Sequence, residues 1–511
     1  MILGRCLARN AAITPGKAAV VDAAGRGWTY AEFSARVNRL ANALAARGIA
    51  SGARLAILDR NSIEYLEAYF AAGAIGAWMV AINFHLKPVD IAFRLAHSGA
   101  GALLVGPEFV PLVHLLPAEL QVRLRGRIWV LGPSQDGMPG YDSLLAEGNA
   151  SPPEVRVCPE DILYIGYTSG TTGAPKGAMV SHRAIVVGYL YKALDYGLDG
   201  KDVSLCPGPF WHSAPRDFAS LALYLGGTCV VTRGFEPPEY LAMVARHRVT
   251  YSFMVPTMFQ LLAEYDSAAE ADVSSIRALI SGGSPLPTAV KERTLARFGD
   301  ILSEFYGATE TRIITNITAG ELARKRRSVG RPIRDVEIRL LDDDGREVPR
   351  GSAGEVFVRG PGLFSGYLDD PERTARSHRG DWFSLGDVGR LDDEGYLTLV
   401  DRKQDVIISG GENIYPNDIE EVLLAHPGVK EAAVIGVPDP TWGELVTAVV
   451  VPRGGAVPPA EELIAHCAAA LPGYMKPRRV EFVEELPRNP VGKVLRRAIR
   501  EPYWKKSQTS N

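Results

Sequence analysis

The chain has 511 residues, a formal net charge of −3 and an apolar content of 46%. A single hydrophobic core rarely extends over so many residues, so two or more domains are expected. The slightly acidic balance excludes the polybasic surface that is typical of nucleic-acid-binding proteins, and we expect no nucleic-acid partner.

The cysteines and the apolar segments indicate the cellular location. The five cysteines are scattered and form no CxxC pair, which argues against a disulfide framework and a structural zinc site. The longest apolar run, 69–82, is too short to cross a bilayer. Arg5 and Arg9 interrupt the N-terminal segment before the apolar core of a signal peptide can form. We therefore expect a cytoplasmic protein without an integral membrane segment.

Helical and strand patterns alternate along the larger part of the chain. A helical period over 30–47 is followed by a buried strand at 54–58, a helix at 62–76 and a strand at 79–82. This alternation predicts α/β layers with largely parallel sheets. Residues 336–358 change to a period of two around a turn, which is typical of antiparallel strands.

A charged segment at 401–405 follows one more expected strand, 397–400. The hundred or so residues after it are enough for a small α+β domain. We therefore predict a large N-terminal domain over 1–400, a hinge at 401–405 and a C-terminal domain over 406–511.

The segment YTSGTTGAPKG, at 167–177, is rich in glycine and hydroxyl groups. It follows an expected strand at 162–165 and precedes Ser181, a plausible start of a helix. Glycines let a backbone approach a ligand closely, while hydroxyls, backbone N–H groups and a lysine bind phosphate oxygens. It is not a Walker A loop, because Pro175 stands where that motif needs glycine. Composition alone fits a polyphosphate cradle and a flexible loop equally well.

Four further motifs decide between these interpretations. They are FYGATE at 305–310, SLGDVG at 384–389, DRKQDVIISGGEN at 401–413 and NPVGK at 489–493. Together with YTSGTTGAPKG they resemble the acyl-adenylate-forming superfamily, which contains acyl-CoA synthetases, adenylation domains of peptide synthetases and beetle luciferases. The motifs keep the family's order and approximate spacing over nearly the whole chain, with Ser384 in place of the usual threonine.

The resemblance implies an ATP site with Mg²⁺. The hydroxyls, glycines and lysine of the first loop would hold the β- and γ-phosphates: Thr168, Ser169, Gly170, Thr171, Thr172, Gly173 and Lys176. Thr309 would contact the α-phosphate and Glu310 would bind Mg²⁺. The adenine side would comprise Gly282, Gly283, Ser284, Tyr306 and Gly307.

Asp387 and Arg402 match positions that bind the ribose hydroxyls, and Lys493 matches the catalytic lysine. Without the motifs, each residue has a plainer explanation. Asp387 would stabilise a turn in a glycine-flanked loop, and Lys493 would be an exposed lysine in a Pro/Gly turn.

The resemblance also implies a second half-reaction in which the C-terminal domain rotates and a thiol attacks the adenylate. Gln404 occupies the hinge position, where the family usually has aspartate or lysine. His212 would gate the attack, although a lone histidine in an apolar stretch is more often structural. The pantetheine tunnel would be lined by Ser409, Gly410, Gly411 and Trp442, although Trp442 fits the core of the small domain equally well.

The acyl pocket is the part of the site on which the sequence says least. By resemblance it would include Trp211, Arg216, Phe218, Met254, Met258 and Arg312. The apolar members favour a fatty or aryl acid. Either arginine could face a second carboxylate, as in malonate-type ligases, but such an arginine more often pairs with an acidic residue of the protein.

The expected fold is α/β: layered α/β subdomains with a small β-barrel-like part in the large domain, and a small, mobile α+β C-terminal domain. The expected function is that of an ATP-dependent, AMP-forming ligase that joins a fatty or aryl acid to coenzyme A. Two alternatives stay open: a free-standing enzyme that loads an acyl-carrier protein, and a malonate-type dicarboxylate–CoA ligase. A homo-oligomer is compatible with the sequence.

Overall fold

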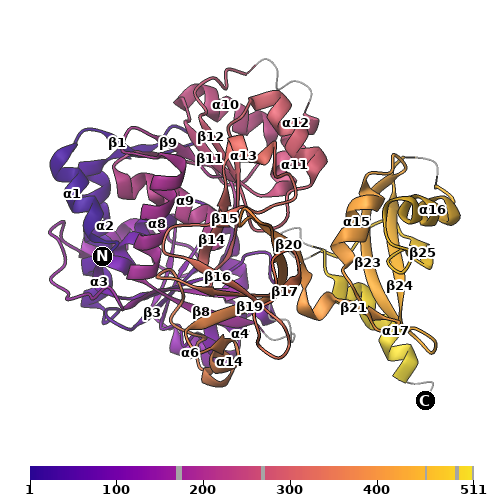
Figure 1. Cartoon of the computed structure of the whole chain (residues 1–511). Helices are drawn as coiled ribbons and strands as arrows, with labels where there is room; N and C mark the ends of the chain where they lie inside the picture. The colour runs from indigo at the N-terminus through magenta and orange to yellow at the C-terminus, as the bar shows by residue number, and fades with distance from the viewer. Residues whose placement is uncertain (169–174, 266–270, 455–456, 489–493, 509–511) are drawn as a thin grey trace. The chain divides into compact units, whose positions relative to one another are not determined.

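The computed structural model describes residues 1–168, 175–265, 271–454, 457–488 and 494–508, and the chain divides into two compact units. The first unit combines Met1–Glu337 with Arg359–Asp381, and the second combines Ile338–Val358 with Trp382–Asn511. Both units mix sheets and helices, which confirms the predicted α/β class (Figure 1).

A six-stranded sheet in the first unit carries the phosphate-loop motif. Its order is β6 (Ile128–Val130), β5 (Ala102–Val105), β3 (Arg54–Leu58), β4 (Trp78–Ala81), β7 (Ile162–Thr168) and β8 (Lys176–Ser181). All neighbouring pairs are parallel except β7 and β8. The sequence pattern does not predict β8, because its lysine and glycine belong to the loop motif.

A nine-stranded sheet forms the other layer of strands in this unit. Its order is β15 (Arg331–Pro332), β14 (Arg312–Ile317), β13 (Leu302–Ala308), β12 (Ala278–Ser281), β11 (Tyr251–Met254), β9 (Val203–Leu205), β10 (Thr228–Val231), β1 (Ala18–Asp22) and β2 (Gly27–Thr29). The central strands are parallel and buried, and antiparallel pairs close both edges. This is the largely parallel arrangement that the alternating pattern predicts.

Helices cover these sheets. They are α1 (Arg5–Ile13), α2 (Tyr30–Ala46), α3 (Ile63–Ile75), α4 (Pro88–His97), α5 (Val110–Val113), α6 (Ala118–Arg123), α7 (Tyr141–Glu147), α8 (His182–Tyr196), α9 (Ser213–Leu225), α10 (Pro237–His247), α11 (Pro256–Glu264), α12 (Thr288–Phe298), α13 (Ala319–Leu322) and α14 (Pro371–Arg376).

Local sequence explains where the early helices begin and end. The Thr29 side chain and Glu32 form a capping box at the start of α2, and the Ser62 side chain accepts from the backbone N–H of Tyr65 at the start of α3. Gly76 ends α3 with a φ of 68°, a left-handed conformation that glycine adopts without strain. Ser181 caps α8, as its place in the sequence predicts.

The second unit contains two sheets. In one, β16 (Glu337–Leu341), β17 (Ala353–Arg359) and β19 (Trp382–Leu391) are neighbours, and β20 (Leu397–Arg402) pairs with β19. This is the region for which the sequence predicts antiparallel strands. The other has the order β22 (Glu412–Ile414), β21 (Ile407–Ser409), β24 (Gly443–Pro452) and β23 (Val429–Asp439), with β25 (Arg479–Phe482) paired to β24.

The second of these sheets is covered by helices on both faces. Alternate residues of β23 and β24 pack against α15 (Pro416–Leu424) and α16 (Ala460–Ala470) on one face, as Val434 and Val450 do. On the other face, Ile435 and Val449 pack against α17 (Arg496–Gln508). A 3₁₀ turn, η3 (Lys403–Asp405), joins the two sheets of this unit and contains the proposed hinge.

No helix in the described part of the chain combines the length and the hydropathy that crossing a bilayer requires. The cysteines in that part of the chain form no disulfides, and four of the five are buried.

A buried histidine gives the first unit a defined response to acid. The His182 side chain has no exposed surface, and its Nδ1 accepts a hydrogen bond of 3.3 Å from the Leu3 backbone N–H. Burial lowers the pKa of His182 to about 4. Below about pH 6.5 the His182 imidazole is therefore protonated in the unfolded chain but stays neutral in the folded chain. The free energy of unfolding consequently falls as the pH drops from 6.5 towards 4.

We predict that His182→Asn reduces this acid sensitivity by up to roughly 3 kcal/mol, because the variant has no imidazole to protonate. Urea unfolding of both proteins at pH 6.5 and pH 4.5 measures the effect. An equal loss of stability in both would contradict a neutral, buried His182.

Candidate functional site

The phosphate-loop motif connects two paired strands. Strands β7 and β8 are antiparallel, and Thr168 lies directly opposite Lys176. The hairpin therefore holds Thr168 and Lys176 of the motif at fixed positions at the edge of the sheet. The intervening candidates lie outside the described residues: Ser169, Gly170, Thr171, Thr172 and Gly173.

A chain of hydrogen bonds joins this hairpin to the carboxylate of Glu310. The Thr168 Oγ1 donates to Glu310 Oε1 at 3.2 Å, and the Tyr367 hydroxyl donates to the same oxygen at 3.0 Å. The Lys176 Nζ donates to the Tyr367 hydroxyl at 3.0 Å and lies 4.6 Å from the centroid of its ring. Glu310 is only 3% exposed, so the two hydroxyls bind its carboxylate inside the protein.

Sequence reasoning missed Tyr367. Its backbone pairs with Ala178 of β8, which places the phenol beside the hairpin. Burial and the Glu310 charge raise the pKa of Tyr367 far above its usual value, so the phenol keeps its proton and can donate a hydrogen bond to Glu310. The pairing joins residues 189 apart in the sequence, and no local pattern indicates it.

Thr309 and Glu310 lie in the tight turn between β13 and β14. The Thr311 Oγ1 accepts from the Ala308 N–H at 3.0 Å, which fixes this turn. A side chain at Gly307 would place a Cβ 1.9 Å from the Arg312 carbonyl oxygen, so only glycine fits there. The Thr309 hydroxyl lies 3.3 Å from the Ser213 hydroxyl at the start of α9.

The expected adenine-side residues come together where β12 and β13 end. A Cβ on Gly282 would lie 2.7 Å from the Phe305 ring, and Gly283 has a φ of 90°, so both positions require glycine. Tyr306, next to Phe305, is buried. The Ser284 segment is anchored by Glu304, whose Oε1 accepts from the Leu286 N–H at 3.1 Å and whose Oε2 pairs with Lys291.

His212 immediately precedes α9. Burial lowers its pKa to about 4, and the nearby Arg216 charge adds to the shift, so the imidazole is neutral at pH 7. Asn61 fixes the approach to His212: its side chain accepts from the Phe210 N–H at 2.7 Å and donates to the Gly208 carbonyl at 2.9 Å. Sequence reasoning also missed Asn61, because its partners are distant in sequence.

Helix α4 contacts Tyr167, the residue before Thr168. The His97 Nδ1 lies 2.9 Å from the Tyr167 hydroxyl.

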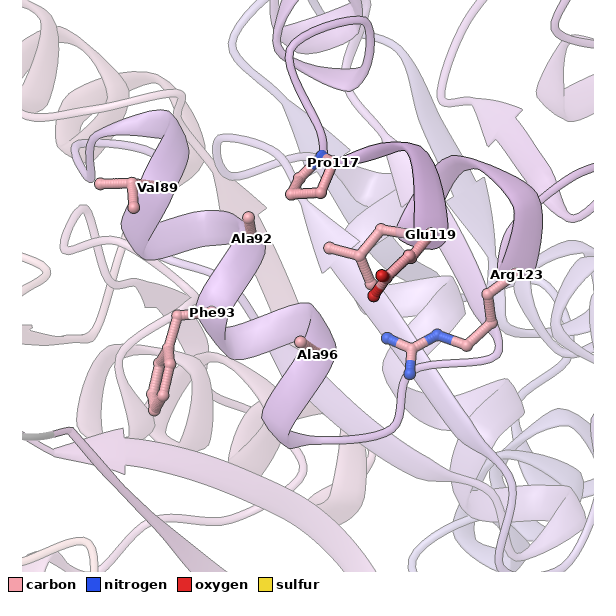
Figure 2. A pocket seen from close by; sticks show the side chains of 8 residues that line it. Val89, Ala92, Phe93, Ala96, Pro117, Glu119 and Arg123 are labelled. Carbon is pink, nitrogen blue, oxygen red and sulfur yellow. The ribbon is translucent and has the colours of Figure 1, made fainter.

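Helix α4 also borders a groove of about 530 Å³ against α6, which Figure 2 shows with Val89, Ala92 and Phe93 on α4 and Arg123 on α6. None of the sequence-predicted site residues lines this groove.

The arginines expected near the acyl pocket both contact a protein carboxylate. Arg216 has no exposed surface; its Nη2 donates to Asp217 at 3.1 Å and its guanidinium lies 3.8 Å from the Tyr164 ring centroid. Arg312 also pairs with Asp217. The structure therefore favours the ordinary explanation, an arginine paired with a protein acid.

The other pocket candidates differ in burial. Phe218 and Met254 are fully buried, and Phe218 stacks on Phe253 with centroids 5.0 Å apart. Trp211 and Met258 are partly exposed.

In the second unit, Asp387 and Arg402 face each other across β19 and β20. They are register partners, and the Arg402 Nε lies 3.3 Å from Asp387 Oδ1. The expectation that Asp387 lies in a loop is wrong: the residue belongs to β19, and the neighbouring Gly386, with a φ of 77°, bends the strand rather than ending it.

The residues expected to line a pantetheine tunnel are neighbours. Gly410 and Gly411 both have positive φ values and form the two-residue turn between β21 and β22, directly after the buried Ser409. The Gly410 N–H donates to the Trp442 carbonyl at 2.8 Å. Trp442 is 37% exposed and stacks under Arg478, so it is not a core residue.

The two remaining candidates are the hinge residue and the catalytic lysine. Gln404 is exposed in η3. Lys493 lies outside the described residues.

Comparisons with known proteins agree with this arrangement. Residues 7–368 match the family model of the AMP-binding enzyme, and residues 418–493 match that of the AMP-binding enzyme C-terminal domain. The chain is 39% identical to feruloyl-CoA synthase from Amycolatopsis sp, over 98% of this chain and 99% of that protein.

Two further relatives are similar over nearly their full lengths. Long-chain-fatty-acid–CoA ligase FadD13 from Mycobacterium tuberculosis is 33% identical, over 98% of each chain. The solved structure of the anthranilate CoA ligase AuaEII, in complex with anthranoyl-AMP, superposes with a TM-score of 0.90 at 26% identity, covering 99% of this chain and 98% of that one. The two family matches and the shared course of the whole chain lead to one conclusion: this protein belongs to the AMP-binding enzyme family.

Proposed function

We propose that the protein is an AMP-forming acid–CoA ligase that converts an aryl or fatty acid into its CoA thioester. The observation that carries the proposal is the hydrogen-bonded chain of Lys176, Tyr367, Glu310 and Thr168 at the base of the phosphate-loop hairpin. CoA ligases among the relatives favour CoA over a carrier protein as the acceptor.

In the first half-reaction, a carboxylate oxygen of the acid attacks the α-phosphorus of ATP, and the bond to pyrophosphate breaks. Both reactants are anionic, so catalysis depends on holding them in line and offsetting their charges. The hairpin ends at Thr168 and Lys176 are suited to bind the β- and γ-phosphates. Thr309 and the Asp387–Arg402 pair would bind the α-phosphate and the ribose.

Glu310 fits an ion such as Mg²⁺. The ion prefers oxygen ligands, and it is commonly held by one or two carboxylates together with substrate phosphates. Glu310 offers a buried carboxylate beside the hydroxyls of Thr168 and Tyr367. A bound Mg²⁺ would supply charge neutralisation for the phosphates. The described residues contain no cluster of three acidic, histidine or cysteine side chains, and the proposed site requires none.

We assign to Lys493 the charge that stabilises the attack, delivered by a C-terminal lobe over 406–511 that turns about Gln404. In the second half-reaction the thiol sulfur attacks the acyl carbon, and the bond to AMP breaks. Neutral His212 would gate the thiol's access, and the pantetheine path would be lined by Ser409, Gly410, Gly411 and Trp442. The thiol proton passes to solvent.

The acid is proposed to be aryl or fatty rather than dicarboxylic. Asp217 contacts both Arg216 and Arg312, so each guanidinium already has a carboxylate partner within the protein. Trp211 and Met258, the partly exposed candidates, would provide apolar surface for such an acid.

The five free cysteines suit the cytoplasm, where we place the enzyme.

A panel of carboxylic acids tests the proposal. With ATP, Mg²⁺ and CoA present, we expect AMP release and thioester formation with hydroxycinnamic, benzoic or medium-chain fatty acids, and little with malonate. Replacing CoA by a phosphopantetheinylated acyl-carrier protein should remove most of the thioester product.

Lys493→Ala is the internal control for the panel, because it should block AMP formation from ATP while sparing thioester formation from preformed acyl-adenylate. A wild-type protein that makes no AMP with any acid, or that uses only the carrier protein, would contradict the proposal.

Tyr367→Phe tests the hydrogen-bonded chain. The variant loses the donor to Glu310 and the acceptor of Lys176, so we expect adenylate formation to slow roughly tenfold, which corresponds to about 1.4 kcal/mol. Single-turnover release of pyrophosphate measures the rate, and thermal unfolding reports on stability.

Tyr191→Phe is the matched control, because it removes a similar bond of 2.7 Å, to Asp335 on the surface. This variant should keep the wild-type rate. Equal slowing in both variants would show that the Tyr367 hydroxyl has no special part in adenylation.

A further inference from the structure

A single arginine ties the segment before the proposed pivot to the C-terminal lobe. Arg496 is at the start of α17, and only 18% of its side chain is exposed. Its guanidinium contacts residues from three other elements: Asp401 at the end of β20, Asp405 in η3, and Asn417 and Glu420 in α15.

The contacts are short and engage the whole guanidinium. The Arg496 Nε and Nη2 donate to the two carboxylate oxygens of Glu420 at 2.9 and 2.6 Å, which is a bidentate pair. The Nη1 donates to Asp401 Oδ1 at 3.1 Å and lies 3.7 Å from Asp405 Oδ2. Three carboxylates thus surround one guanidinium.

These contacts differ in one decisive respect. Glu420 and Arg496 both follow Gln404 in the sequence, so a lobe that turns about Gln404 carries them together. Asp401 precedes Gln404. The Arg496–Asp401 bond therefore crosses the pivot, and so does the bond that the Asn417 side chain donates to the carbonyl of residue 400 at 2.8 Å. A rotation about Gln404 breaks these bonds and keeps the Arg496–Glu420 pair.

Backbone hydrogen bonds hold the Asp401 carboxylate in position to bind Arg496. Its carboxylate also accepts from the N–H of Arg402 at 2.7 Å and from the N–H of Asn417 at 3.1 Å. Burial raises its pKa to about 6, against the opposing effect of Arg496, and the nearby Glu420 and Asp405 charges add to the rise. The Asp401 charge is therefore costly to bury unless Arg496 stays in place.

We propose that Arg496 and Asp401 form a latch that holds the C-terminal lobe in one of its two working orientations. Arg496 is a positioning residue in this account: it touches no substrate, and it follows Lys493 by three residues in the sequence. The latch rests on the lobe rotation of the proposed function. It implies that breaking the latch changes the balance between the half-reactions without changing the chemistry of either.

Asp401→Asn and Arg496→Lys test the latch. Asp401→Asn removes the negative charge that Arg496 pairs with. In Arg496→Lys, the single ammonium group cannot form hydrogen bonds to Glu420 and Asp401 at the same time. We expect the ratio of the adenylation rate to the thioester-forming rate to change roughly five- to tenfold in both variants. The KM for ATP should stay near the wild-type value, because Asp387 and Arg402 are unaltered.

Glu444→Gln is the matched control. Glu444 accepts a hydrogen bond of 2.8 Å from Arg500, which lies in the same helix as Arg496. Both Glu444 and Arg500 come after Gln404 in the sequence. The variant should keep the wild-type ratio. Trypsin cleavage after Arg402 and Lys403 gives a second readout that does not depend on activity: it should accelerate in both latch variants and stay unchanged in Glu444→Gln.

Three results would overturn the latch: an unchanged ratio in both latch variants, an equal change in Glu444→Gln, or unaltered cleavage of the hinge. A wild-type enzyme with two measurable half-reactions and unresponsive latch variants refutes the latch alone. A wild-type protein without AMP-linked thioester formation refutes the proposed function itself.

Discussion

The buried carboxylate of Glu310 is the group on which the site depends. Only 3% of the residue is exposed, and its carboxylate accepts hydrogen bonds from the hydroxyls of Thr168 and Tyr367. Burying a carboxylate without such donors is costly. The two donors come from strand β7 and from the segment beside β8, so the hairpin and the turn between β13 and β14 must pack correctly for both hydrogen bonds to form.

The same constraint explains the glycines around the site. Gly166 lets β7 approach Thr309, since a Cβ there would lie 2.6 Å from the threonine methyl group. Gly307 likewise makes room for the turn that carries Thr309 and Glu310. Backbone segments that pass this closely leave no room for side chains. The fold therefore fixes the reacting geometry through close packing, and the polar groups act within that frame.

The second unit holds its buried and half-buried charges in two different ways. Asp387 and Arg402 pair across two neighbouring strands, whereas Arg496 is shared by three carboxylates. A pair within one sheet is maintained whenever the sheet is folded. The Arg496 cluster spans the proposed pivot, Gln404. When the C-terminal lobe rotates, Arg496 and Glu420 move together, whereas Asp401 does not move with them. Such a group can bias a rotation without taking part in the chemistry.

Local patterns are sufficient for several parts of the structure. The caps at Ser62, Gly76 and Ser181 and the buried strand at 54–58 follow from residue type and periodicity, because these signals depend on near neighbours in the chain. The motifs identify four candidates that the structure brings together: Thr168, Lys176, Thr309 and Glu310.

The residues that sequence reasoning missed share one physical cause. Tyr367, Asn61 and Arg496 obtain their roles from partners far away in sequence, and a lone tyrosine, asparagine or arginine has no pattern that predicts them. Pairing with the adjacent strand of a hairpin explains why Asp387 and Lys176 lie in strands although their glycine-rich surroundings predict loops.

The path of one oxygen atom tests the central claim, attack of the acid on the α-phosphorus, most directly. If a substrate acid labelled with ¹⁸O in its carboxylate is converted to the thioester, mass spectrometry should find one ¹⁸O in the released AMP and none in pyrophosphate. Unlabelled AMP, or label in inorganic phosphate with ADP as the nucleotide product, would contradict an acyl-adenylate and the account built on it.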